Sequence, residues 1–378
     1  MKIVIASDSF KGSMTSIEVA QAAKQGIYQV YPNAQVIAVN VADGGEGTVE
    51  AIVDALGGEI VKARVSDPLY RAMEACYGIA GETAIIEMAA ASGLPLLKQE
   101  ERNPWLTSTY GTGEMIMDAI ARGCRHFLVG IGGSATNDAG TGMLQAMGFR
   151  FYDDKGVEID RCAGGRLADI VRIDDSQVPE AVRQAVFTVA CDVDTPFCGP
   201  EGAAPVFAPQ KGADAEMVSK LDAGMASFAK VIEDKYFVNV APIAGAGAAG
   251  GMGGAFYAFL HATLKKGIDM VLDAIDFDTT LRGADLVITG EGKVDFQTAK
   301  GKTAAGVLAR ANNQHIPVIA IGGCVEMCDS LLQMGFAGIY PILEEKVPLE
   351  VAMQRDFAMS NVTKTVTKIL TKLSIQSS

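Results

Sequence analysis

Lys2-Ile-Val-Ile-Ala-Ser-Asp-Ser-Phe-Lys11 is the stretch of sequence that decides the fold. Residues 2–6 contain the apolar run of a buried β-strand, and charged residues follow that strand closely. Thr15 and Glu18 then have the spacing of a capping box, which predicts a helix through about residue 25. A strand, a polar loop and a helix in this order form the first unit of a parallel α/β sheet.

The same signals alternate through the rest of the chain. Near the two ends the β-α pattern is clean, with strands predicted at residues 34–39, 285–289, 317–321 and 338–342 and helices at 48–56 and 356–373. In the middle, short strands separated by Pro and Gly predict some antiparallel pairing at residues 59–65, 73–79 and 83–88. Further strands are predicted at 127–131 and 187–190, a helix at 215–233, and the beginning of a helix within 137–147.

The length of the chain and the placement of the clean pattern predict two α/β domains. A chain of 378 residues is long for one hydrophobic core. Because the clean β-α pattern occurs at both ends, we predict one discontinuous α/β domain of residues 1–60 plus 285–378. Residues 61–284 are predicted to form an inserted α/β domain, and we expect the active-site cleft to lie between the two.

The composition excludes several classes of protein. Hydrophobic residues make up 49% and charged residues 20% of the chain, which is typical of a packed globular enzyme. The 32 Lys and Arg against 45 Asp and Glu give a net charge of −13, which argues against a nucleic-acid-binding surface. No stretch approaches the roughly 20 apolar residues of a membrane helix, and the N-terminus is predicted to be a strand and not a signal peptide. Seven scattered cysteines predict reduced thiols and a cytoplasmic location.

Glycine-rich and charged loops follow most of the predicted strands. Ligands of parallel sheets bind outside the carboxyl ends of the strands, so we expect these loops to converge. Glycine lets backbone N–H groups approach an anion, carboxylates hold Mg²⁺, and lysines neutralise phosphate charge. Several such loops in one α/β chain predict phosphoryl transfer. The loops are residues 8–11, 42–48, 132–138, 245–254, 289–295 and 300–303.

Two loops supply candidate catalytic and metal-binding carboxylates. Asp43 lies on the glycine-rich turn 42–48, where it would bind Mg²⁺ or accept a proton from a substrate hydroxyl. Glu46 on the same turn either belongs to the site or caps the following helix. Asp192 follows another predicted strand and is a second candidate metal ligand.

Charged residues after the first strand and near residue 290 are candidates for contact with phosphate or substrate. Lys11 would neutralise a phosphate and Asp8 would hold metal or substrate, unless the two form only a local ion pair. Glu291 and Lys293 belong to a charged loop after a strongly apolar strand. We therefore place all four among the candidate site residues.

Ser134, Thr136 and Asn137 are candidates for holding a carboxylate or hydroxyl group of a ligand. They follow a predicted strand closely and carry hydrogen-bonding side chains in a dense run. Asp138 ends this run and is predicted to cap the next helix.

Two further loops resemble nucleotide-binding motifs only in part. Gly245, Gly247 and Gly250, with Gly251 directly after them, have the spacing of a dinucleotide fingerprint. Three interpretations stay open: a phosphate loop, tight backbone packing without a ligand, and a nicotinamide site. Lys302 lies near a predicted helix start and would meet phosphate, although a phenylalanine replaces the first glycine of a Walker A loop.

Six ordered segments make the chain similar to the bacterial glycerate kinases of the type I family. The likeness covers essentially the whole chain. The segments are Ile5-Ala-Ser-Asp-Ser-Phe-Lys-Gly12, Ala42-Asp-Gly-Gly-Glu-Gly-Thr48, Gly132-Gly-Ser-Ala-Thr-Asn-Asp-Ala-Gly-Thr-Gly142, Cys191-Asp-Val-Asp-Thr-Pro-Phe-Cys-Gly-Pro-Glu-Gly-Ala203, Gly245-Ala-Gly-Ala-Ala-Gly-Gly-Met-Gly-Gly254 and Thr289-Gly-Glu-Gly-Lys-Val-Asp295.

The resemblance implies ATP-dependent, Mg²⁺-requiring phosphorylation of D-glycerate, with 2-phosphoglycerate favoured over 3-phosphoglycerate as the product. It also implies a flavodoxin-like inserted domain and a role in glyoxylate, glycerate or sugar-acid catabolism. The expected partners are small molecules and neither nucleic acid nor membrane, and homo-oligomer formation stays open. The expected roles are catalysis for Asp43, Asp192, Lys11 and Lys293; substrate binding for Asp8, Ser134, Thr136, Asn137 and Glu291; and cofactor binding for Gly245, Gly247, Gly250, Gly251 and Lys302.

Two alternative functions remain from the residues alone. The glycine spacing near residue 245 also suits a nicotinamide-dependent oxidoreductase acting on a hydroxy acid. A metabolite-binding regulator without catalytic activity would keep the same loops. Release of ADP in the presence of D-glycerate and Mg²⁺ separates both from a kinase.

Overall fold

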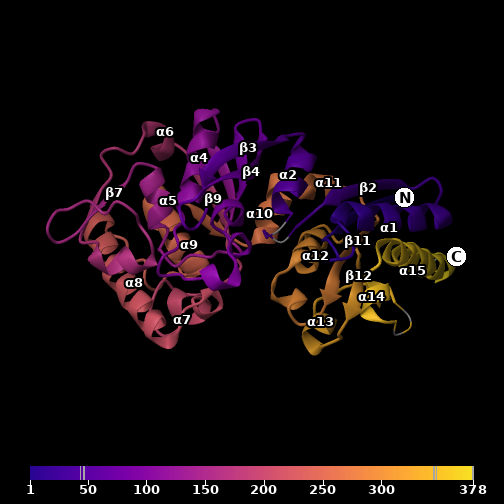
Figure 1. Cartoon of the computed structure of the whole chain (residues 1–378). Helices are drawn as coiled ribbons and strands as arrows, with labels where there is room; N and C mark the ends of the chain where they lie inside the picture. The colour runs from indigo at the N-terminus through magenta and orange to yellow at the C-terminus, as the bar shows by residue number, and fades with distance from the viewer. Residues whose placement is uncertain (43, 46, 344, 346, 377–378) are drawn as a thin grey trace. The chain divides into compact units, whose positions relative to one another are not determined.

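The protein folds as two compact units. The computed structural model describes residues 1–376 except 43, 46, 344 and 346. The first unit contains Met1–Asp43 and Val271–Ser378, and the second contains Gly44–Met270. The α/β fold class predicted from the sequence is confirmed, because each unit contains a β-sheet with helices packed on it (Figure 1). The predicted domain boundaries and the flavodoxin-like character of the insert stay predictions.

The sheet of the first unit is fully parallel, in the strand order β13-β12-β11-β1-β2. β1 lies between β2 and β11, so the order of strands reverses there, and a crevice at the carboxyl ends of such strands is the usual ligand site. The strands are β1 (Lys2–Ser7), β2 (Gln35–Asn40), β11 (Leu286–Val294), β12 (Val318–Val325) and β13 (Gly338–Pro341). The helices are α1 (Ser16–Val30), α11 (Phe277–Leu281), α12 (Thr303–Asn313), α13 (Asp329–Gln333), α14 (Leu349–Ala352) and α15 (Arg355–Gln376), with a 3₁₀ turn at Thr298–Lys300.

Helices α1 and α15 lie side by side on this sheet (Figure 1). They are so close that a Cβ added at Gly26 would lie 2.6 Å from the carbonyl oxygen of Thr363. The predicted capping box of α1 is confirmed, because Thr15 Oγ1 accepts from the N–H of Glu18 and the Glu18 carboxylate accepts from the N–H of Thr15. Glu18 also pairs with Arg355, so the cap of α1 is tied to the first turn of α15.

The main sheet of the second unit is mixed, in the strand order β10-β9-β6-β5-β4-β3. The predicted antiparallel pairing is confirmed for β3, β4 and β5, while β5, β6, β9 and β10 run parallel. The strands are β3 (Glu59–Ser66), β4 (Ala72–Ala80), β5 (Thr83–Glu87), β6 (His126–Gly130), β9 (Val186–Ala190) and β10 (Thr263–Lys265), with a separate hairpin of β7 (Arg150–Tyr152) and β8 (Arg172–Asp174).

Helices cover the mixed sheet, and aromatic residues fill much of the core below them. Phe127 of β6 stacks on Phe187 of β9 with ring centroids 4.8 Å apart. The helices are α2 (Thr48–Leu56), α3 (Ala89–Ser92), α4 (Tyr110–Ala121), α5 (Thr141–Ala146), α6 (Glu180–Arg183), α7 (Ala203–Phe207), α8 (Ala215–Tyr236), α9 (Ala248–Leu260) and α10 (Gly267–Ala274), which continues into the first unit. The 3₁₀ turns are Leu94–Leu96, Gln99–Glu101, Gly164–Asp169 and Pro209–Lys211.

Two segments near the candidate site differ from a simple β-α pattern. The helix expected within residues 137–147 begins at Thr141 with Gly140 as its N-cap, so Asp138 is not the N-cap that was predicted, although its buried carboxylate accepts from the N–H groups of Gly140 and Gly142. The segment before Gly245 forms turns and not a strand. That segment therefore lacks the strand that a dinucleotide fingerprint needs before its glycines.

Candidate active site

A cavity of about 760 Å³ in the first unit brings together several residues predicted from the sequence. Asp8 follows β1 at the end of the strand, Glu291 and Lys293 belong to the last part of β11, and Lys302 precedes α12. Lys11 also lines the cavity. The cavity has an apolar wall as well, which includes Phe10, Val325, Ile342, Leu343, Val347, Leu349 and Met353.

The two buried carboxylates of this cavity hold the N-terminus of α12. The side chain of Asp8 accepts from the hydroxyl of Thr303 at 3.0 Å and from the N–H of Ser9 at 2.6 Å. Glu291 accepts from the N–H of Ala304 at 3.1 Å. Carboxylates are favoured at a helix N-terminus, where unpaired N–H groups and the helix dipole are positive. Asp8 and Glu291 therefore hold in place the loop that carries Lys302.

Lys293 stands in a partly exposed ion-pair network beside the cavity. Its Nζ lies 3.0 Å from Glu326 and 3.2 Å from Asp295, and these hydrogen bonds, led by that of Glu326, raise the pKa of the lysine. The pair with Glu326 is exposed on both sides and contributes little to stability, whereas the side chain of Asp295 is largely buried.

In the second unit, the loop after β6 brings Ser134, Thr136 and Asn137 together with a lysine that the sequence analysis missed. Lys211 is 1% exposed, and its Nζ donates to Ser134 Oγ at 2.8 Å and to the carbonyl oxygen of Thr136 at 2.6 Å. Burial lowers the pKa of Lys211 to about 7, and the charge of Asp138 opposes this effect. One signal could have found it, because Lys211 is the only charged residue in the segment 202–213.

Asp138 is buried and organises the start of α4 and of α5. Its carboxylate accepts from the N–H and the hydroxyl of Thr109, both at 2.8 Å, and from the N–H groups of Gly140 and Gly142, both at 3.2 Å. Burial raises the pKa of Asp138, while these four donors favour the ionised form and oppose the shift. The residue holds the loop after β6 against two helices.

The glycines of the segment 245–254 are accounted for by close packing of the backbone. A Cβ at Gly245 would lie 2.7 Å from Cys191 Sγ, and one at Gly251 would lie 2.8 Å from the Cα of Ala139. A Cβ at Gly247 would collide with the carbonyl oxygen of Pro196, and one at Gly250 with that of Thr136. With no strand before it, this segment does not support the nicotinamide interpretation. The cofactor role of these glycines stays a prediction.

The Gly250→Ala variant is expected to lose about 2–4 kcal/mol of unfolding free energy, because the methyl group collides with Thr136 and φ is +68°. Gly156→Ala is the matched control, since φ is +77° there and nothing lies within 4 Å of the added Cβ. Urea unfolding of both variants separates the collision from the strain of positive φ. Equal losses in the two variants would contradict the packing argument.

The two predicted metal ligands differ in what the structure describes. Asp43 lies outside the described residues, as does Glu46. Asp192 is exposed after β9, and one of its carboxylate oxygens accepts from the N–H of Gly267 at 2.9 Å. Mg²⁺ in proteins takes one or two carboxylates together with substrate phosphates and water, and an exposed carboxylate at the end of a parallel strand suits that donor set.

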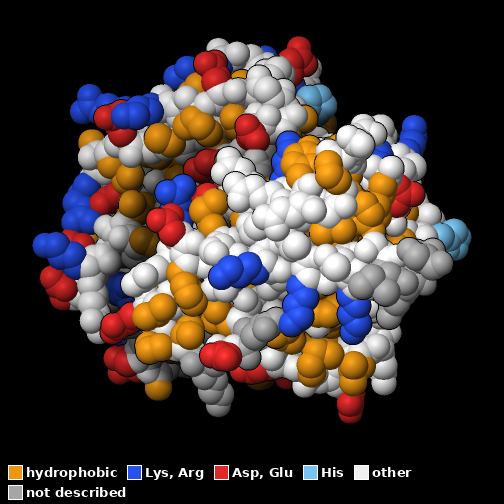
Figure 2. Space-filling model, turned by 90° about the vertical axis from the view of Figure 1, so that its right-hand side faces the viewer, with side chains coloured by type: hydrophobic (Ala, Val, Ile, Leu, Met, Phe, Trp, Pro, Cys, Tyr) orange, Lys and Arg blue, Asp and Glu red, His pale blue; other side chains and the backbone are white. Residues whose placement is uncertain are grey.

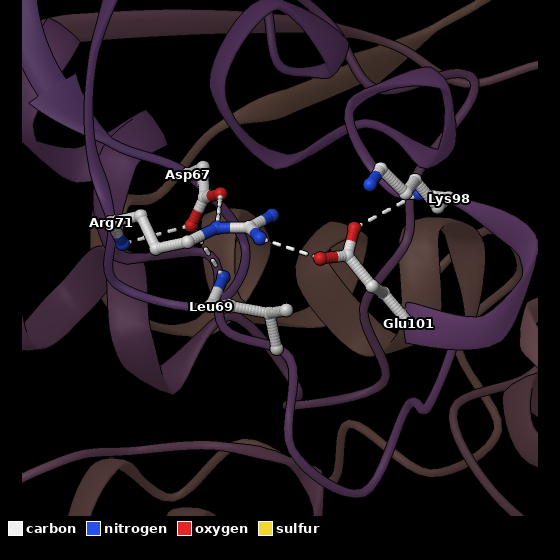
Figure 3. A network of polar contacts seen from close by, with 5 residues as sticks. All are labelled: Asp67, Leu69, Arg71, Lys98 and Glu101. Carbon is white, nitrogen blue, oxygen red and sulfur yellow. Dashed lines mark hydrogen bonds and ion pairs between the residues drawn. The ribbon is translucent and has the colours of Figure 1, made fainter.

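An ion-pair network joins Asp67, Arg71 and Glu101 (Figure 3). Arg71 contacts Asp67 at 2.5 Å and Glu101 at 2.6 Å, and Figure 3 shows the guanidinium group between the two carboxylates. The next residue, Arg102, packs on Gly212, where an added Cβ would collide with its carbonyl oxygen. The network therefore ends one residue before the backbone that packs on Gly212, the residue after Lys211.

Figure 2 shows Lys and Arg scattered among acidic and apolar side chains on the face that it displays. Within the described part of the chain, no helix combines the length and the apolar composition needed to span a membrane.

Comparison with known proteins assigns the chain to one family. The model of the Glycerate kinase family matches residues 3–374. A glycerate kinase of Bacillus cereus (strain ATCC 10987 / NRS 248) is 46% identical over 98% of this chain and 97% of its own length. A glycerate 2-kinase of Escherichia coli (strain K12) is 43% identical over 99% of this chain and 98% of its own. A crystal structure assigned as glycerate kinase 2 from Salmonella typhimurium LT2 superposes with a TM-score of 0.91 at 43% identity, covering 100% of this chain and 99% of that one.

Proposed function

This chain belongs to the glycerate kinase family and is a kinase, and on that premise we propose that it transfers the terminal phosphoryl group of ATP to the C2 hydroxyl of D-glycerate. The products are 2-phosphoglycerate and ADP. The choice of the C2 hydroxyl is supported by the relative that carries the name glycerate 2-kinase.

The observation that carries the proposal is the cavity of the first unit, which we assign to ATP. Its volume of about 760 Å³ lies within the range of small-molecule sites, roughly 300–1,000 Å³. The apolar wall around Ile342 and Met353 suits the adenine base, and Lys11, Lys293 and Lys302 suit the phosphates. The cavity lies beside β1 and β11, where the strand order of the sheet reverses.

Glycerate is assigned to the loop after β6 in the second unit. Ser134, Thr136 and Asn137 carry the hydroxyl and amide groups that suit a carboxylate and two hydroxyls. The Thr136 hydroxyl and the Asn137 amide oxygen are buried and have no hydrogen-bond partner among the described residues. Buried polar groups without a partner are rare, and a polar ligand would satisfy them.

We assign Asp192 to the binding of Mg²⁺, and Asp43 to proton transfer or to the binding of the same ion. When bound, Mg²⁺ would neutralise part of the negative charge of the ATP phosphates. Asp192 would hold the ion by its carboxylate. Asp43 would accept the proton of the glycerate hydroxyl or share the metal.

We also propose that the enzyme works in the cytoplasm, in glyoxylate, glycerate or sugar-acid catabolism.

A coupled assay of ADP release tests the function directly. With ATP, Mg²⁺ and D-glycerate, ADP is expected to appear in a glycerate-dependent manner, and ³¹P NMR is expected to identify 2-phosphoglycerate. Appearance of 3-phosphoglycerate would contradict the choice of hydroxyl only. Absence of glycerate-dependent ADP release, with release on another hydroxy acid, would contradict the substrate.

The Lys11→Ala variant is expected to raise the KM for ATP about tenfold and to leave the KM for D-glycerate within twofold, because one charge-assisted phosphate contact is lost. Lys364→Ala, on the exposed face of α15, is the matched control and is expected to keep both constants. Steady-state kinetics with each substrate varied in turn measures the effect. Unchanged kinetics of Lys11→Ala would remove Lys11 from the site.

A further inference from the structure

Lys211 is a buried lysine without an acidic partner in contact. Among the described residues, no carboxylate lies within 4.0 Å of its Nζ, and both of its hydrogen bonds go to neutral oxygens of Ser134 and Thr136. Burying an unpaired charge is costly, so lysines are rarely buried unless an anion pairs with them. The nearby charge of Asp138 opposes the loss of the proton but makes no ion pair with Lys211.

Lys211 determines whether the Ser134 hydroxyl can donate a hydrogen bond to a ligand. A hydroxyl has one proton and two lone pairs, whereas the protonated form of Lys211, which a bound anion favours, can only donate. Because Ser134 Oγ accepts from Lys211, its own proton is left for another acceptor, and no acceptor for it occurs among the described residues. Ser134 is 8% exposed, whereas Thr136 and Asn137 beside it are fully buried.

The loop holds Ser134 in place before any ligand binds. The carbonyl oxygen of Gly133 accepts from the N–H of Leu94, and the N–H of Ala135 donates to Ser92, both at 2.9 Å. The carbonyl oxygen of Ala135 accepts from the Thr107 hydroxyl at 2.8 Å. Donors fixed in advance bind an anion with little loss of conformational freedom.

We propose that Lys211 is a positioning residue, which orients the Ser134 hydroxyl as a fixed donor to an oxyanion of the substrate and supplies the buried positive charge that this oxyanion neutralises. The inference deepens the proposed function and rests on it. A carboxylate of glycerate and a phosphate of the nucleotide share this chemistry. The kinetic constants of the two substrates distinguish them.

Variants of both residues test the proposal in the whole enzyme. Lys211→Met removes the charge and keeps most of the volume but leaves the carbonyl oxygen of Thr136 without this donor, so its unfolding midpoint is measured beside its kinetics. Lys211→Met and Ser134→Ala are each expected to raise the KM of one substrate at least tenfold, while the KM of the other stays within twofold. Ser134→Thr, which keeps the hydroxyl, is expected to stay within threefold of the wild type. Lys220→Met, an exposed lysine paired with Glu216, is the matched control and is expected to change nothing.

The double variant tests whether the two residues act together. If Lys211 acts through Ser134, Lys211→Met combined with Ser134→Ala is expected to be no worse than Lys211→Met alone. A raised KM for D-glycerate identifies the carboxylate, and a raised KM for ATP identifies a phosphate. Wild-type KM values in both single variants, a fall in kcat alone, or equal losses in Ser134→Ala and Ser134→Thr would overturn the proposal.

A binding measurement separates this inference from the proposed function. Thermal unfolding of the wild type with D-glycerate and with inorganic phosphate is expected to show a rise in midpoint with at least one of them, and Lys211→Met is expected to lose that rise. Failure of the wild type to release ADP would overturn the glycerate kinase activity and leave this comparison intact. An equal rise in wild type and Lys211→Met with both anions would overturn the role of Lys211.

Discussion

Replacing Asp138 with alanine is expected to lower the free energy of unfolding by about 3–5 kcal/mol, one of the two largest effects that we predict. The carboxylate is fully buried and accepts from four donors of Thr109, Gly140 and Gly142. Alanine would leave these donors buried without an acceptor. It would also remove the negative charge that opposes the loss of the Lys211 proton. Urea or guanidinium unfolding, followed by circular dichroism, measures the loss.

Two further variants make this prediction specific. Asp138→Asn keeps one acceptor oxygen and is expected to lose less than Asp138→Ala. Asp153→Ala also removes a carboxylate that accepts from two backbone N–H groups, those of Lys155 and Val157, but at an exposed turn. Its expected loss is about 1 kcal/mol or less, because water replaces the lost contacts. A loss below that of Asp153→Ala would show that Asp138 does not organise the loop.

Replacing Asp43 with asparagine is expected to lower kcat by about 10²–10⁴-fold, the usual contribution of a general base. Asparagine keeps the size of the side chain, so we expect the free energy of unfolding to change much less than the catalytic rate. A hydroxyl is a poor nucleophile until its proton has an acceptor, which is why the loss falls on turnover. Single-turnover kinetics with saturating ATP and D-glycerate measures it.

The dependence on Mg²⁺ separates the two roles assigned to Asp43. A general base lost alone lowers kcat at every Mg²⁺ concentration, whereas a lost metal ligand raises the Mg²⁺ concentration needed for half-maximal rate. Asp54→Asn, an exposed position on α2, is the matched control and is expected to keep wild-type turnover. Turnover of Asp43→Asn near that of the wild type would remove the residue from the catalytic set.

The sequence by itself determined where the main strands and helices form and which charged residues lie near their ends. The strand at residues 2–6, the Thr15–Glu18 capping box and the helix at residues 48–56 all occur where they were predicted, because each depends on neighbours within a few residues. We expected the loops after parallel strands to converge, and in the first unit Asp8, Glu291, Lys293 and Lys302 line one cavity, although Glu291 and Lys293 lie within β11 and not in a loop after it as predicted.

Only the tertiary structure decided which side chains these residues contact. Asp8 reaches Thr303 across 295 positions of sequence, and Lys211 reaches Ser134 across 77. No local sequence pattern predicts such pairs, because the two residues of each pair lie on distant segments that meet only when the core packs. The same reason applies to Gly250, whose requirement for glycine comes from the backbone of Thr136, more than a hundred residues earlier in the chain.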